Sequence, residues 1–115
     1  MEPLDWGSLR ENCAGDESLV NEVLELFRKE AAPLLNDVKT AVASREGVQV
    51  KRTAHRLKGA LVSLGARPSV EAARALELAG SSNDLSSVDA LYATLEREMA
   101  RLLEVIAPKA NAHAA

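Results

Sequence analysis

A histidine, a lysine and a glycine lie close together in the segment Ala54-His55-Arg56-Leu57-Lys58-Gly59. A neutral imidazole is a usable nucleophile near neutral pH. On a helix, a lysine three residues later lies one turn away, where its ammonium can reach an anion carried on the ring. A glycine four residues later removes the side chain that would crowd an approaching partner. The spacing therefore predicts an accessible nucleophile with a cation ready for a negatively charged adduct.

A helix over residues 48–64 is expected to hold this segment. Apolar residues recur there at alternating spacings of four and three, at Val50, Ala54, Leu57, Leu61 and Leu64. At about 100° per residue they form one buried stripe, and the imidazole points away from it. A mid-helix glycine costs roughly 1 kcal/mol relative to alanine, which favours a role outside fold maintenance. The alternative is a solvated helix face with an incidental histidine and a tolerated glycine.

The outer face of this helix carries further basic and apolar residues. A basic rim around the imidazole is expected from Lys51, Arg52, Arg56 and Lys58. A small apolar patch beside it is expected from Val48, Gly59, Val62 and Ala66. Such a face is suited to docking a partner with an acidic pocket, although ordinary exposed residues would look the same.

The central segment resembles a known signature. Residues 54–59, followed by Gly65-Ala66, resemble the A-H-x-L-K-G…G-A pattern of histidine-containing phosphotransfer (HPt) domains, the intermediates of multistep phosphorelays. The resemblance covers roughly residues 4–107. It includes Asp16-Glu17 before an acidic helix and Leu76-Glu77 on the helix after Gly65.

This resemblance implies a function and a set of partners. His55 would accept a phosphoryl group on Nε2 from the aspartyl phosphate of a receiver domain and pass it to another receiver. Lys58, and Lys51 beside it, would offset phosphoryl charge. Glu77 matches a position where related domains place Gln or Glu near the histidine, which implies an orienting or docking role. The partners would be receiver domains of response regulators or of a hybrid histidine kinase.

The rest of the chain predicts an all-α fold, an antiparallel up-down four-helix bundle with a short N-terminal capping helix. Residues 1–115 form one domain, with the cap at about 4–12, the bundle at about 16–107 and a flexible tail at 108–115. Pro33 predicts a kink or break in the first long helix. Gly80 is expected to close the helix that follows Pro68, and Pro108 to stop the last helix.

Composition excludes several classes of protein. The net charge of −3 gives no global basic field for nucleic acid. A single cysteine and two histidines exclude an internal disulfide and a credible zinc set. No apolar run approaches the ~20 residues needed to cross a bilayer, and the acidic N-terminus is unlike a signal peptide. A cytoplasmic monomer is therefore expected.

The sequence also bears on catalysis and on the alternatives. There is no Gly-rich phosphate loop and no acidic set for magnesium, and a convex helix face offers no nucleotide cavity, so no autokinase activity and no cofactor are expected. Magnesium is expected on the partner receiver domain. One alternative is the phosphorylatable N-terminal domain of a chemotaxis-type histidine kinase. Two others are a protein-interaction bundle that is never phosphorylated and a metal- or haem-binding bundle.

Overall fold

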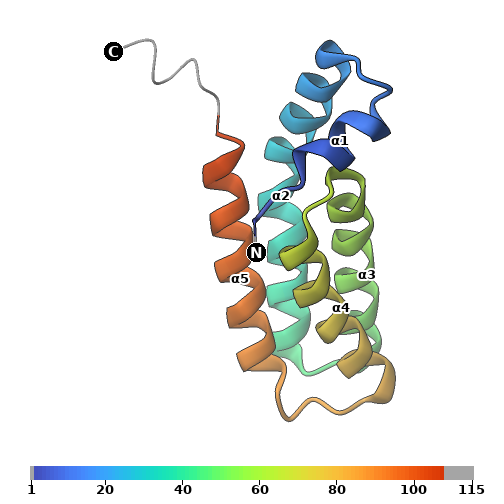
Figure 1. Cartoon of the computed structure of the whole chain (residues 1–115). Coiled ribbons are helices and arrows are strands. Elements are labelled where there is room, and N and C mark those ends of the chain that lie inside the picture. The colour runs from blue at the N-terminus through green and yellow to red at the C-terminus, as the bar shows by residue number, and fades with distance from the viewer. Residues whose placement is uncertain (1, 108–115) are drawn as a thin grey trace.

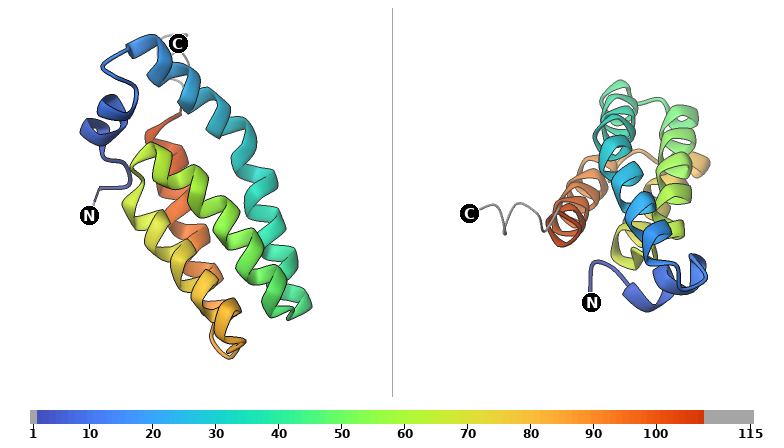
Figure 2. Two further views of the ribbon diagram at one scale, coloured as in Figure 1. Left: turned by 90° about the vertical axis from the view of Figure 1, so that its right-hand side faces the viewer. Right: turned by 90° about the horizontal axis from the view of Figure 1, so that it is seen from above.

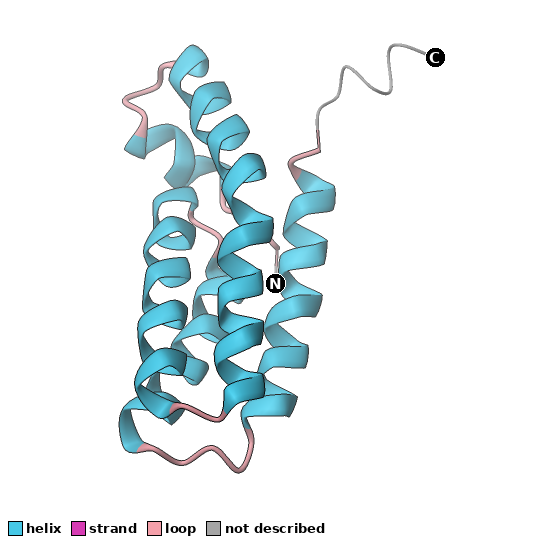
Figure 3. Cartoon of the chain, turned by 180° about the vertical axis from the view of Figure 1, so that it is seen from behind, coloured by secondary structure: helices cyan, strands magenta, loops and turns pink. Residues whose placement is uncertain are grey.

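The computed structural model describes residues 2–107 and contains five helices in that range. They are α1 (Trp6–Asn12), α2 (Glu17–Ser44), α3 (Gly47–Leu64), α4 (Arg67–Ser82) and α5 (Val88–Val105). The four long helices run alternately down and up, and α1 lies across the end of the bundle where α3 meets α4 (Figure 1). Short loops join them, and the described residues contain no strand (Figure 3). The predicted capped four-helix bundle is confirmed.

The apolar stripes of the helices meet in one core. The five residues of the α3 stripe are all buried, as the spacing predicted. The stripe of α5 is buried at Val88, Leu95, Met99, Leu102 and Ile106. Because leucine, valine and alanine supply most of the core, the helices can pack closely without large aromatic side chains.

Local side-chain and backbone chemistry fixes the helix ends. Asp16 caps α2 by accepting hydrogen bonds from the backbone amides of Ser18 and Leu19. Gly65 ends α3 in the left-handed conformation, with φ of 76°. The amide of Asp5 donates to the carbonyl of Gly65 at 2.9 Å, which fixes the segment before α1 against the α3–α4 turn.

Pro33 does not break α2. The helix is continuous from Glu17 to Ser44, with Pro33 in its interior. Its N-terminal part leans away from the axis of its C-terminal part (Figure 2). Proline removes one hydrogen bond but leaves the flanking turns intact, and packing of buried residues on both sides, including Phe27 and Val38, holds the helix together. Of the kink or break expected at Pro33, the structure shows a bend within a continuous helix (Figure 2).

Gly80 does not end α4. The helix continues to Ser82, and Asn83 provides the left-handed C-cap with φ of 56°. Gly80 is instead buried against α3. The expectation that Gly80 closes the helix is therefore wrong, because this glycine serves packing between two helices rather than termination.

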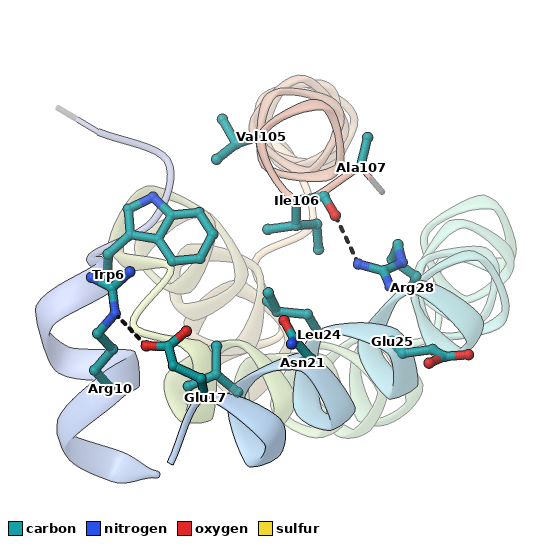
Figure 4. Close-up of a pocket in the computed structure, with 11 residues that line it drawn as sticks. Trp6, Arg10, Glu17, Asn21, Leu24, Glu25, Arg28, Val105, Ile106 and Ala107 are labelled. Carbon is teal, nitrogen blue, oxygen red and sulfur yellow. Dashed lines mark hydrogen bonds and ion pairs between the residues drawn. The ribbon is translucent and has the colours of Figure 1, made fainter. Parts of the chain in front are cut away.

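An open hollow lies between α1, α2 and α5 (Figure 4). Leu24 and Ile106 are among its apolar lining residues, and Arg28 Nη1 donates to the carbonyl of Ile106 at 2.8 Å across it. None of the site residues expected from the sequence lines it. The expected stop at Pro108 and the tail at 108–115 lie outside the described residues, and α5 ends before them. No helix in the described range is long and apolar enough to cross a membrane.

Candidate functional site

His55 lies on the outer face of α3, and its side chain is 67% exposed. Ala54 and Leu57, its neighbours on the helix, are fully buried and anchor this turn to the core. The imidazole therefore faces solvent rather than the interior, as the helical spacing predicted. This orientation does not suit a metal or haem held inside the bundle. Among residues 2–107, no three His, Cys, Asp or Glu side chains are grouped to hold a metal ion.

Glu77 of α4 reaches across to α3 and contacts both His55 and Lys58. Its Oε2 lies 2.6 Å from His55 Nδ1, and its Oε1 lies 2.6 Å from Lys58 Nζ. The Glu77 and Lys58 side chains are only 16% and 21% exposed, so this ion pair is largely shielded from solvent. We call His55, Lys58 and Glu77 the site triad.

The charge state of Glu77 follows from its surroundings. Burial acts to raise its pKa, but the hydrogen bonds from Lys58 and His55 together outweigh burial and leave the pKa below its ordinary value of 4.5. Glu77 is therefore a carboxylate near neutral pH and can only accept hydrogen bonds. His55 Nδ1 must then carry the proton in this contact, which leaves the lone pair of Nε2 available in the neutral ring.

Gly59 leaves the surface beside His55 open. A Cβ built on Gly59 would meet no atom within 4 Å outside its own helix turn. Neither packing nor a positive φ requires glycine here. The surface at Gly59 is therefore open, and the role of this glycine in access to the ring stays a prediction.

The four residues of the basic rim differ in their exposure to solvent. They are Lys51, Arg52, Arg56 and Lys58. The first three are exposed, whereas Lys58 is mostly covered and paired with Glu77. A shallow, open hollow beside the imidazole is lined by Lys51, Arg52, His55, Arg56 and Glu77. The face is thus less convex than expected, and the hollow is rimmed by cations.

The apolar patch needs one correction. Val48 and Val62 are 65% and 53% exposed and lie on the two sides of His55 along α3. Ala66 is fully buried at the α3–α4 turn, so its expected place in a docking patch is wrong. It packs inward because Gly65 turns the chain before α4 begins. From here on, the apolar patch means Val48, Gly59 and Val62.

Sequence reasoning missed one feature of the site. It treated Lys58 as an unengaged cation, whereas Lys58 is already paired with Glu77. A signal for this pairing was present, because Glu77 adjoins the buried Leu76 on the edge of the apolar stripe of α4. A carboxylate in such a position needs a cationic partner nearby.

Within residues 2–107 the structure is a capped antiparallel four-helix bundle, in which a carboxylate from α4 holds the solvent-facing His55 of α3. Residues 22–105 match the model of the Hpt domain family, and the chain belongs to that family. Such domains are phosphotransfer modules of phosphorelays rather than catalytic enzymes, and they interact with receiver domains. The chain therefore has a histidine phosphotransfer function.

Two known proteins are similar to the chain. Sensor protein TorS of Escherichia coli (strain K12) is 41% identical over 64 residues, which are 54% of this chain and 7% of TorS. The chain thus spans only a small part of that relative. The crystal structure of histidine-containing phosphotransfer protein B (HptB) from Pseudomonas aeruginosa PAO1 matches with a TM-score of 0.83. That match covers 90% of each chain at 23% sequence identity and shows the shared fold.

Proposed function

We propose that His55 is the phosphoacceptor and that it exchanges a phosphoryl group between the aspartates of receiver domains. The observation that carries this proposal is the 2.6 Å contact between Glu77 Oε2 and His55 Nδ1 on an otherwise exposed ring. The carboxylate fixes the ring through one nitrogen and leaves the other facing solvent with a lone pair.

The transfer step follows from this geometry. Nε2 of His55 attacks phosphorus in the aspartyl phosphate, the P–O bond to the aspartate breaks, and the carboxylate leaves with the electron pair. The ring gains positive charge as the N–P bond forms, because Nδ1 keeps its proton. Glu77 lies against that proton and offsets the charge. The reverse step returns the phosphoryl group to a second carboxylate.

Lys58 provides the second electrostatic contribution. Its ammonium lies one helical turn from His55, within reach of an anion on the ring. As the phosphoryl group arrives, Lys58 exchanges part of its contact with Glu77 for contact with phosphoryl oxygens. Lys51, exposed on the rim of the hollow, adds positive charge on the other side.

Docking uses the rest of the outer face. The cations Lys51, Arg52 and Arg56 complement the acidic pocket of a receiver domain and increase the rate of encounter. The apolar patch packs against the partner, and Gly59 admits it close to the ring. Magnesium is bound by the receiver domain, so this chain needs no cofactor. The protein acts as a monomer in the cytoplasm and does not phosphorylate itself from ATP.

The deciding experiment is phosphoryl transfer from a phosphorylated receiver domain. Wild type is compared with His55→Gln, and His113→Gln serves as a matched control because it removes the chain's second histidine. We expect acid-labile, base-stable label on wild type and His113→Gln, and none on His55→Gln. Label on His55→Gln places the nucleophile elsewhere. Absence of label from all three proteins with several receivers favours an interaction bundle that is never phosphorylated.

Three further measurements test the finer parts of the proposal. Incubation with labelled ATP alone should leave the protein unlabelled, and label on His55 under these conditions contradicts the absence of autokinase activity. Light scattering during gel filtration should give the mass of one chain at micromolar concentration. Fractionation of cells that produce the protein should recover it in the cytoplasmic fraction.

A further inference from the structure

Gly80 of α4 lies against the main chain of α3. A Cβ built on Gly80 would stand 2.5 Å from the amide nitrogen of Lys51 and 2.6 Å from the carbonyl oxygen of Gly47. Ordinary van der Waals contact for a Cβ begins at 3.4 Å. Both obstacles are backbone atoms, which cannot rotate aside as the end of a side chain can. The two helices therefore approach at this point to a distance that only glycine permits.

Conformational freedom does not explain this glycine. Gly80 lies inside α4 and has no positive φ. In a helix interior glycine costs roughly 1 kcal/mol relative to alanine. The requirement for glycine at this position is therefore one of close packing between α3 and α4.

This close contact lies next to the site triad. Lys51 precedes His55 by about one turn on α3, and Gly80 follows Glu77 by about one turn on α4. Because the two helices are antiparallel neighbours, the Gly80–Lys51 contact and the Glu77–His55 contact are about one helical turn apart along the hairpin, roughly 5.4 Å. Separation of the helices at the first contact is thus transmitted to the second.

We propose that Gly80 is a positioning residue, whose contact with the backbone of Lys51 sets the α3–α4 separation at which one Glu77 carboxylate holds both His55 and Lys58. The kinetic consequence rests on the proposed function, whereas the geometric consequence does not. No part of Gly80 touches the imidazole or a phosphoryl group, and its effect passes through Glu77.

The distances make the triad sensitive to this separation. An alanine at position 80 requires the helices to move apart by roughly 1 Å if its Cβ is to reach ordinary contact. Hydrogen bonds weaken beyond about 3.2 Å, so a 2.6 Å contact lengthened by this amount is largely lost. A different Glu77 rotamer could restore one contact, but the carboxylate must reach two donors at once. Either His55 or Lys58 then loses its partner.

The test compares Gly80→Ala with wild type by two measurements that need no phosphoryl transfer. Nitrogen-15 NMR of His55, at a pH where the ring is neutral, reports which ring nitrogen carries the proton. Carbon-13 NMR of the Glu77 carboxyl group reports its pKa. We expect the population with the proton on Nδ1 to fall and the pKa of Glu77 to rise, because the hydrogen bonds that lower it are weakened. Phosphoryl transfer from a receiver should slow about tenfold.

Two controls separate positioning from general destabilisation. Gly7→Ala makes the same substitution in α1, where the new Cβ meets only Asp5 Oδ1 at 3.4 Å. Val20→Ala removes buried volume from α2 and lowers stability far from the triad in sequence. Both should keep the wild-type protonation pattern of His55. If Gly80→Ala does not fold, Gly47→Ala replaces it, since its Cβ crowds the same contact through Asn83 Oδ1 and the carbonyl of Gly80.

The outcomes are distinct. A folded Gly80→Ala protein with wild-type protonation of His55 and wild-type pKa of Glu77 overturns the proposal. The proposal is also overturned if Val20→Ala shows the loss of the Nδ1 proton and the raised pKa of Glu77 that are expected for Gly80→Ala. If wild type accepts no phosphoryl group, the proposed function fails. The NMR comparison still decides whether Gly80 positions the triad.

Discussion

Lys58 Nζ lies 2.6 Å from Glu77 Oε1, on the carboxylate oxygen that does not contact His55. The ammonium thus has an anionic partner before any phosphoryl group is present. This pairing keeps the lysine within one turn of the ring and prevents it from extending into solvent. A cation that is already held in place loses less side-chain entropy when it binds phosphoryl oxygens.

Replacement of Lys58 by glutamine should slow phosphoryl transfer to His55 by about tenfold, because one charge that stabilises the transferring group is removed. The measurement is the rate of label uptake from a phosphorylated receiver domain. Lys29→Gln is the matched control, since Lys29 pairs with Glu25 on the exposed face of α2. Equal rates for the two variants would show that Lys58 does not act on the phosphoryl group.

Replacement of Gly59 should separate stability from function. Gly59→Ala should raise the free energy of unfolding by about 0.5–1 kcal/mol, because alanine favours the helix and its Cβ meets no neighbour. Gly59→Leu should fold equally well but transfer phosphoryl groups more slowly, since the larger side chain obstructs the partner. Urea unfolding and transfer assays on the same preparations test this. A leucine variant with the wild-type rate would refute the role in access.

Replacement of Glu77 by glutamine should change how stability depends on pH. The pKa of Glu77 in the folded protein lies below its ordinary value of 4.5, so the carboxylate contributes stability that is fully present above pH 4.5. That contribution is lost as the pH falls through the folded-state pKa. Urea unfolding should therefore show wild type more stable than Glu77→Gln near neutral pH, with the difference shrinking in acid. Glu71→Gln, which alters an exposed pair with Arg74, should show a much smaller effect.

Charge reversal on the basic rim should slow docking. Arg52→Glu and Arg56→Glu should each lower the association rate with a receiver domain severalfold at low salt, and the difference from wild type should shrink as salt is added. Stopped-flow association at two ionic strengths measures this. Lys39→Glu makes the same charge change on α2. If it slows association equally, net charge rather than the rim governs the encounter.

Much of the fold follows from residue spacing. The stripe on α3 predicted both the buried face of that helix and the outward direction of His55, because each depends only on helical period. The Asp16 cap and the Gly65 turn were likewise predictable, since both rest on local backbone chemistry. The same period placed Val48 and Val62 on the exposed face.

Other features depend on which helices become neighbours. A glycine can end a helix or admit another helix closely, and both uses exploit the missing side chain. Gly80 serves the second use, which the spacing in α4 does not reveal. Ala66 is expected in the apolar patch, yet the turn at Gly65 directs it inward. The link from Glu77 to Lys58 needs the α3–α4 pairing, which no single helix encodes.

The His55–Glu77 contact joins residues only 22 positions apart, and Lys58, Gly59 and Gly80 lie on the same helical hairpin of α3 and α4. Closing so short a loop costs little chain entropy, so this hairpin can assemble early and locally during folding. The helices α1, α2 and α5 then cover it without supplying any member of the site triad. The sequences of these three helices can change during evolution, provided that the core remains apolar. The residues of the site triad stay within the contiguous stretch that forms α3 and α4. Stability and reactivity are in this way open to separate evolutionary change.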